Sequence, residues 1–335
     1  MTTSSRAAGT QHRRVAAALL LLATVALWAP SGSSAPEIAR VGSPLALTVD
    51  DDRVTCATAD VSLDRRGPLH VISPPASANR GGPGLRLVLR ATDQLEANPQ
   101  ARAAFLRAAA AWESALALTT ITVVVDVDYG ATSFGQPFPS NVLGYTDPQL
   151  LFTATNYAFV RSHLLAEASS DEERDLYERL PRARIQTDLG PTSGVYGPSA
   201  TFRAVHFLAP VAKPKADMER GLGPPPAVAI SSAFAFDFDP SDGIAEGTRD
   251  FEAVAMHELG HVLGFTSTVG SRELNGSFPV AVSFLDLFRV RPSTTLETFG
   301  TADRIQRSGG EQVFFGGSRA LPLSTGRQDG TGGDG

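Results

Sequence analysis

The chain has 335 residues, of which 42% are hydrophobic, and it carries a formal net charge of −6. This balance gives no reason to expect a nucleic acid or an anionic membrane surface as a partner. The single cysteine, Cys56, excludes a disulfide within the chain, so that stability must come from core packing, with or without bound ions.

The first part of the chain, residues 1–35, has the features of a signal peptide. Three arginines precede an apolar run, residues 15–29, which only Thr24 interrupts. A run of this length is short for a membrane span and typical of a signal-peptide core. We therefore expect a secreted protein with no membrane attachment after cleavage; a retained anchor is the alternative. The cleavage position stays open, because Pro36 is a poor first residue for a mature chain.

The next segment, residues 36–83, is rich in Pro, Ser, Gly and Asp. Short β-like runs occur at residues 45–48 and 70–72. This composition predicts a lead-in segment or a partly ordered arm that ends near residues 80–83. A folded domain is then expected over residues 84–335.

That domain is predicted to open with a strand, a helix and a second strand. Residues 85–90 show the alternation of a strand. Residues 99–116 have Pro99 in a first helical turn and apolar side chains on one face. Residues 120–127 are rich in β-branched side chains, which favour a strand. A strand, a long helix and a strand are typical of the start of an α/β layer.

Further along, residues 156–178 are predicted to be mostly helical, and residues 204–208 to form a strand that contains His206. This histidine is a possible distant metal ligand, although a structural role is favoured. Residues 227–236 are predicted to form a strand. By analogy with zinc peptidases, that strand would border a cleft and pair with an extended substrate.

Three carboxylates follow in a short polar stretch: Asp237, Asp239 and Asp242, closed by Gly243. Carboxylate and backbone oxygens around such a turn are able to hold Ca²⁺. The stretch lacks the full twelve-residue calcium loop with its closing glutamate. A polar turn is therefore the favoured interpretation, and a calcium site the alternative.

The most informative pattern is His257-Glu258-Leu259-Gly260-His261. On a helix, residues four apart lie on one face, so that both imidazoles can bind one metal ion. Glu258 follows the first histidine and can take a proton from a water on that metal. The alternative is a helix whose two histidines bond to core carbonyls or to solvent.

The flanking residues support a buried helix around this pattern. Most of them are apolar, Thr248 or Asp250 can cap the start, and Gly264 can end the helix. Polar groups carried into an apolar wall need partners, and a metal ion is a natural one.

The segment 257–265 resembles the HExxHxxGF core of metzincin-type zinc endopeptidases, and most closely the leishmanolysin branch. Together with residues 236–244 and 285–289, it also resembles a group of exported bacterial metallopeptidases. The specific part of the resemblance covers about residues 227–289.

The resemblance implies a zinc-dependent endopeptidase acting on proteins or peptides. The domain over residues 84–335 would then be its catalytic domain, with an α+β metzincin-like fold. This fold has a mixed twisted sheet, a long helix and an active-site helix. His257 and His261 would bind Zn²⁺, and Glu258 would act as the general base.

The chain also departs from the metzincin pattern. Ser267 stands where a compact metzincin has its third histidine, and no histidine follows His261. No methionine follows the motif either. In leishmanolysin-like enzymes an insertion precedes the third histidine. We therefore expect the third ligand beyond residue 335 and an incomplete C-terminal part of the fold. Asp286 is the internal candidate, although pairing with Arg289 is its favoured role.

Two other classes of function stay open. One is a catalytically silent secreted binding or adhesion module, and the other is a zinc hydrolase that does not cleave peptides. Retention of Glu258 argues against the silent module, because a purely structural site has no use for it. Cys56 is expected to be a buried or incidental thiol, although its place before the domain makes a cysteine that blocks the metal conceivable.

Overall fold

The computed structural model describes residues 38–40, 45–50, 53–58, 67–73, 84–117 and 119–323. The predicted signal peptide lies outside the described residues. In the described part of the chain, no helix combines the length and the apolar character needed to cross a bilayer.

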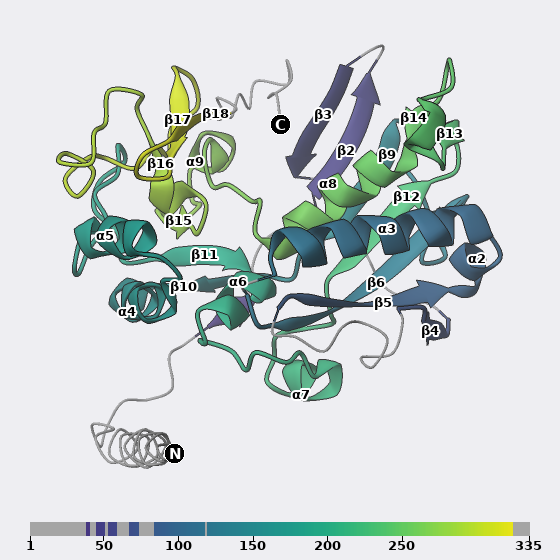
Figure 1. Ribbon diagram of the computed structural model, residues 1–335, viewed down its shortest axis with the longest axis horizontal. Coiled ribbons are helices and arrows are strands. Elements are labelled where there is room, and N and C mark those ends of the chain that lie inside the picture. Colours follow the sequence, from purple (N-terminus) through teal and green to yellow (C-terminus); the bar gives the residue numbers. More distant parts are fainter. Residues whose placement is uncertain are drawn as a thin grey trace, which may run out of the picture. The chain divides into compact units, whose positions relative to one another are not determined.

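The largest sheet has seven strands in the order β3-β2-β9-β12-β6-β5-β4 (Figure 1). The strands span β2 Leu45–Asp50, β3 Arg53–Thr58, β4 Leu69–Val71, β5 Arg86–Thr92, β6 Thr122–Gly130, β9 Val142–Asp147 and β12 Ala227–Ser231. Strands β12, β6 and β5 run parallel, whereas β9, β2, β3 and β4 are antiparallel to their neighbours. The fold class is therefore mixed α+β, as the sequence predicts.

The predicted opening of the domain is present. Strands β5 and β6 flank the helix α3, Pro99–Ala115, with the short helix α2, Asp93–Glu96, before it. The side chain of Asn98 caps α3 by accepting a hydrogen bond from Ala101 N at 3.0 Å, and Pro99 lies in the first turn. Both features stabilise a helix start, because they satisfy or remove amides that have no partner within the helix.

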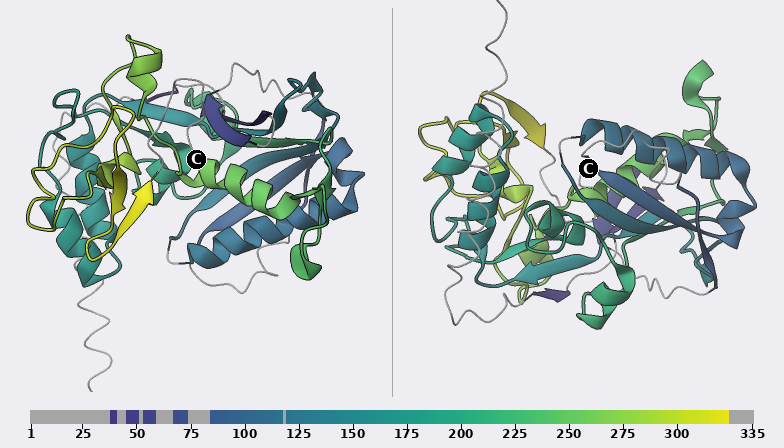
Figure 2. Two further views of the ribbon diagram at one scale, coloured as in Figure 1. Left: turned by 90° about the horizontal axis from the view of Figure 1, so that it is seen from above. Right: turned by 60° about the horizontal axis from the view of Figure 1, so that its bottom comes forward.

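Two helices cover one face of this sheet. Helix α3 packs against the helix α8, Phe251–Leu263, and the two lie side by side in both orientations of the molecule (Figures 1 and 2). The main hydrophobic core joins their facing sides to the sheet through alanines of α3, apolar residues of α8 and the inward side chains of β5, β6 and β12. Close approach of the two helices follows from the small alanine side chains.

An aromatic cluster within and beside this core surrounds Phe251, the first residue of α8. Its ring lies 5.3 Å from that of Phe105, 5.2 Å from Tyr129 and 5.0 Å from Phe238. We expect Phe251→Ala to lower the free energy of unfolding by about 3–5 kcal/mol, the usual cost of emptying a buried aromatic site. Urea denaturation measures this change. Leu274→Ala, at an exposed position, is the control and should stay within about 0.5 kcal/mol of the unmodified chain.

A second hydrophobic core lies around a four-stranded sheet of order β1-β10-β11-β15. Its strands are β1 Ala39–Arg40, β10 Leu150–Thr153, β11 Val195–Pro198 and β15 Val282–Ser283. Helices α4 Tyr157–Glu167, α5 Asp171–Arg179 and α6 Ser199–Ala204 accompany it, with a third sheet of β16 Arg289–Val290, β17 Gln312–Phe315 and β18 Ala320–Leu323. The short elements that remain are β7 Thr132–Ser133, β8 Gln136–Pro137, α7 Pro214–Glu219, β13 Phe236–Asp237, the 3-10 helix η2 Pro240–Asp242, β14 Arg249–Asp250, α9 Ser271–Leu274 and the 3-10 helix η3 Asp286–Phe288.

The segment that the sequence assigns to a lead-in takes part in these sheets. Strand β2 pairs with β9, and β4 pairs with β5, so both edges of the seven-stranded sheet come from residues 36–83. The described residues of this segment are therefore tied to the rest of the chain by backbone hydrogen bonds.

The prediction that residues 156–178 are mostly helical is confirmed; they form two helices, because the Ser170 side chain starts α5 afresh by accepting a hydrogen bond from Glu173 N. Two local predictions differ from the structure. His206 is in a turn after α6, with a φ of 55°, and not in a strand. The strand predicted over 227–236 ends at Ser231, and its neighbours β6 and β9 pair with both of its edges. It therefore has no free edge for a substrate.

Candidate metal centre

Helix α8 carries the residues of the His257-Glu258-x-x-His261 pattern and begins and ends as the sequence predicts. Asp250 is the cap, and its carboxylate accepts a hydrogen bond from Ala253 N at 3.0 Å. Gly264 ends the helix with a φ of 131°, which a residue with a side chain rarely adopts. The helix is thus fixed at both ends, and this fixes the direction of its side chains.

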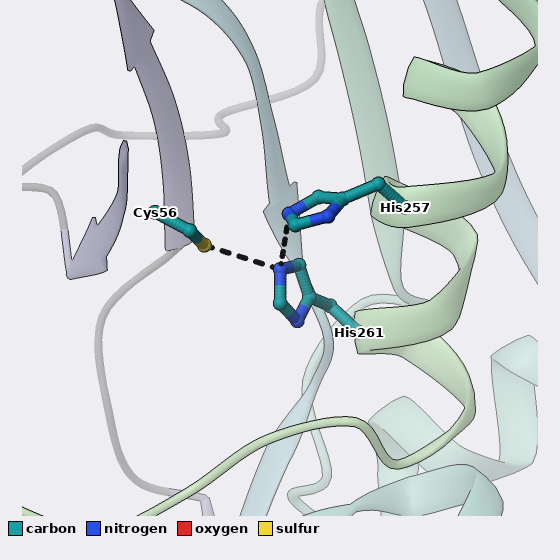
Figure 3. A group of neighbouring side chains, drawn as sticks. All are labelled: Cys56, His257 and His261. Atoms are coloured by element: carbon teal, nitrogen blue, oxygen red, sulfur yellow. Dashed lines mark hydrogen bonds between the residues drawn. The ribbon is translucent and has the colours of Figure 1, made fainter. Parts of the chain in front are cut away.

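The two imidazoles project from successive turns of α8 toward the same point (Figure 3). Their Nε2 atoms are 3.0 Å apart. The Nδ1–H of His261 donates to the carbonyl oxygen of Phe265 at 2.6 Å, so that its Nε2 is the unprotonated nitrogen and presents its lone pair to the other two donors. Burial lowers the pKa of both histidines, that of His261 to about 4 with a further contribution from His257. Both are neutral at pH 7, the form that binds metal ions.

A third donor reaches this point from a distant part of the sequence. The sulfur of Cys56, on β3, lies 3.1 Å from Nε2 of His261 (Figure 3). Burial, and then the nearby Glu258, raise the pKa of this thiol to about 12. The donor atoms of Cys56, His257 and His261 all lie within 4.8 Å of one another. Among the described residues this is the only group of three or more His, Cys, Asp or Glu side chains close enough to hold a metal ion.

Glu258 is buried between α8 and β9. Its Oε2 accepts a hydrogen bond from the hydroxyl of Thr146 at 2.5 Å, and the same hydroxyl lies 3.1 Å from the carbonyl oxygen of Glu258. Its Oε1 has no hydrogen-bond partner among the described residues. Burial raises the pKa of this carboxyl to about 8, and the bond from Thr146 opposes the rise. A buried polar atom without a partner is costly, and a cation or a water on that cation would offset the cost. The residues present therefore fit a metal ion.

A glycine on β9 gives the carboxyl its space. A Cβ atom at Gly144 would lie 3.2 Å from Oε1 of Glu258 and 3.2 Å from the carbonyl oxygen of Ala229. A side chain here would crowd the free oxygen of the carboxyl. Gly144 and Thr146, two residues apart on one strand, thus shape the surroundings of both carboxyl oxygens.

Three residues considered for the metal lie elsewhere. The Asp286 carboxylate is fully buried and accepts hydrogen bonds from Ser267 Oγ at 3.0 Å and Thr268 N at 2.8 Å. It also forms an ion pair with Arg289 at 2.6 Å, so the favoured pairing is confirmed. Both Ser267 and Asp286 are thus engaged with each other and stand outside the group of three donors. His206 is exposed and lies 3.3 Å from Glu167.

The carboxylates of the possible calcium loop bond to the backbone of their own turn. Asp237 accepts hydrogen bonds from Asp239 N at 2.9 Å and Ala245 N at 3.0 Å, and Asp239 accepts one from Ser241 N at 3.3 Å. The backbone bonds lower the pKa of Asp237, and the hydroxyl and then the backbone N–H of Ser241 lower that of Asp239. The geometry is that of the favoured polar turn, and calcium binding with Asp242 stays a prediction.

Thr146 escaped the sequence analysis, because no motif contains it. Cys56 is named there as a buried or incidental thiol, with a role in blocking the metal as the alternative, and not as one of the ligands. No protein-family model, curated protein or solved structure matches the chain. The inference of function therefore depends on the site.

Proposed function

We propose that this protein is a secreted zinc-dependent endopeptidase with a metzincin-like fold. One observation carries the proposal: two imidazole Nε2 atoms lie 3.0 Å apart on one face of α8, with the buried carboxyl of Glu258 between them in sequence. Neutral nitrogen donors with a thiol nearby suit Zn²⁺ better than hard cations, which prefer oxygen. The predicted signal peptide supports export.

Zinc, when bound by His257 and His261, supplies a Lewis acid that polarises a carbonyl and lowers the pKa of water. Glu258 takes the proton from the attacking water through its free Oε1 and passes it to the leaving amine. Thr146 holds the other carboxyl oxygen, so that Oε1 keeps one direction. The carbonyl of Phe265 keeps the imidazole of His261 oriented.

The test uses the purified chain without its signal peptide. Its metal content is measured, and cleavage of casein is followed with and without a chelator. The proposal expects zinc in the protein, casein cleavage, loss of cleavage on chelation and recovery when zinc is restored. Retained zinc without cleavage of any peptide would point to a silent module or another hydrolase, and would refute the proposal.

The contact between Thr146 and Glu258 gives a prediction about this reaction. Thr146→Val keeps the shape of the side chain and removes the hydroxyl that donates to Oε2 at 2.5 Å. The carboxyl then loses its fixed orientation, so we expect kcat to fall by about tenfold or more, the cost of one lost hydrogen bond to a charged group. KM should change little, because the hydroxyl is buried behind Glu258.

Thr146→Ser restores the hydroxyl and is the matched control, with kcat close to that of the unmodified chain. A valine variant with unchanged kcat, or a serine variant as impaired as the valine variant, would contradict a positioning role for this hydroxyl.

A further inference from the structure

We infer that Cys56 is the third protein ligand of the metal, brought to α8 by strand β3 at the edge of the seven-stranded sheet. The inference rests on the proposed metal site and deepens it. It places the missing ligand 205 positions upstream of His261, where Cys56 Sγ lies beside Nε2 of that histidine.

The sheet fixes the direction of the Cys56 side chain. Cys56 pairs with Leu47 of β2, and Leu47 pairs with Gly144 of β9. Residues directly opposite each other in antiparallel strands point to the same face of the sheet. The Cβ direction of Gly144 leads to Glu258 on α8. The thiol of Cys56 therefore points to the face that α8 covers, and the absence of a side chain at Gly144 leaves room between them.

The distances agree with a shared metal ion. With zinc–nitrogen distances of about 2.0–2.1 Å and a zinc–sulfur distance of about 2.3 Å, a tetrahedral site places two nitrogens roughly 3.3 Å apart and nitrogen and sulfur roughly 3.6 Å apart. The corresponding distances are 3.0 Å between the two Nε2 atoms and 3.1 Å between Sγ and Nε2 of His261. These two distances are about half an ångström or less shorter than the tetrahedral values, and the third, between Cys56 and His257, is within 4.8 Å.

The donor count supports the same conclusion. A catalytic zinc ion usually has three protein ligands and one open position for water. Cys56, His257 and His261 supply three, whereas the other candidates, Ser267 and Asp286, are bonded to each other. The structure therefore assigns the third ligand position to the thiolate of Cys56. This residue is on β3, which joins the seven-stranded sheet by pairing with β2.

The test compares the purified chain with Cys56→Ser and Cys56→Ala by zinc affinity and by the absorption spectrum of the Co²⁺-loaded protein. We expect a thiolate-to-cobalt charge-transfer band in the unmodified chain and its loss in both variants. Loss of a group that only hydrogen-bonds to a metal ligand lowers metal affinity by up to roughly 100-fold. Loss of Cys56, as a ligand itself, should lower zinc affinity by more than that. Cys56→His, which supplies nitrogen in place of sulfur, should recover part of the affinity without the band. Far-ultraviolet circular dichroism shows whether each variant is folded.

The outcomes separate this inference from the proposed function. If the unmodified chain binds no zinc, both fail. If it binds zinc and cleaves peptides, but shows no charge-transfer band and keeps its affinity in Cys56→Ser, the inference fails and the proposed function stands. A serine variant that keeps zinc and cleaves faster than the unmodified chain would make the thiol a blocking group, and would also overturn the inference.

Discussion

Glu258→Gln is expected to keep zinc bound and to lower kcat for peptide cleavage by about 10²–10⁴-fold, the usual contribution of a general base. Glutamine has the shape of glutamate and can still bond to Thr146, but it cannot take a proton from water. Zinc content should be unchanged, since His257 and His261 are untouched. Steady-state kinetics on a peptide substrate, with zinc measured on the same sample, tests both statements.

The chain offers a matched control on the same helix. Glu252 is in the first turn of α8, where its carboxylate pairs with Arg107 at 2.7 Å near the surface. Glu252→Gln makes the same chemical change away from the imidazoles, so kcat should stay close to that of the unmodified chain. Turnover in Glu258→Gln near that of the control would refute the assignment of the base.

When no metal is bound, the difference in folding stability between Glu258→Gln and the unmodified chain should depend on pH. Burial raises the pKa of Glu258 from 4.5 in the unfolded chain to about 8 in the folded one. Its contribution to stability is therefore complete below pH 4.5 and is lost as pH rises through about 8. Glu258→Gln lacks this loss. The stability of the metal-free glutamine variant relative to the unmodified chain should thus increase from pH 5 to pH 9.

The sequence predicts helix α8 well because every signal for it is local. The cap Asp250, the terminal Gly264 and the four-residue spacing of the histidines all lie within fifteen residues of one another. Helix α3 is predicted for the same reason, from Pro99 and an apolar face. Such features depend on backbone geometry over a few turns, which the order of residues determines.

The rest of the site depends on pairings between distant strands. Cys56 meets His261 only because β3 pairs with β2 and β2 pairs with β9, and no pattern near residue 56 indicates these partners. Thr146 likewise becomes relevant only once β9 lies beside α8. The apolar run that begins at Ala227 identified a strand, but its central position in the sheet follows from pairing with both neighbours. The sequence of a short apolar strand does not show whether the strand lies at the edge or in the middle of its sheet.

His206 shows the opposite error, in which a local pattern suggests the wrong element. Its neighbours Val205 and Leu208 are buried, as in a strand. The burial comes instead from a turn that closes α6, in which the amides of Phe207 and Leu208 both donate to the carbonyl oxygen of Phe202. A short run with two buried apolar residues fits either structure, and the helix just before it decides the outcome.

Loss of the imidazole of either His257 or His261 is expected to remove bound zinc from the protein. His257→Ala and His261→Ala each remove a nitrogen donor from the group around the metal position. We expect each variant to fall from about one zinc per chain to almost none after gel filtration, because two remaining donors rarely retain zinc against competition. Peptide cleavage should be lost with the metal. Metal analysis of the eluted protein measures the change directly.

His257→Ala and His261→Ala should differ in how much bound zinc they regain when zinc is added in excess. The imidazole of His261 contacts Cys56, His257 and the Phe265 carbonyl. Its removal therefore also takes away the contact that it makes with the thiol and with that carbonyl. His257 contacts fewer of these groups, and its loss leaves Cys56 and His261 in place at 3.1 Å. We therefore expect His257→Ala to recover more zinc than His261→Ala at a large excess of zinc. His206→Ala, at an exposed position outside the site, is the control and should keep its full zinc content. Unchanged stoichiometry in either α8 variant would contradict the assignment of that histidine as a ligand.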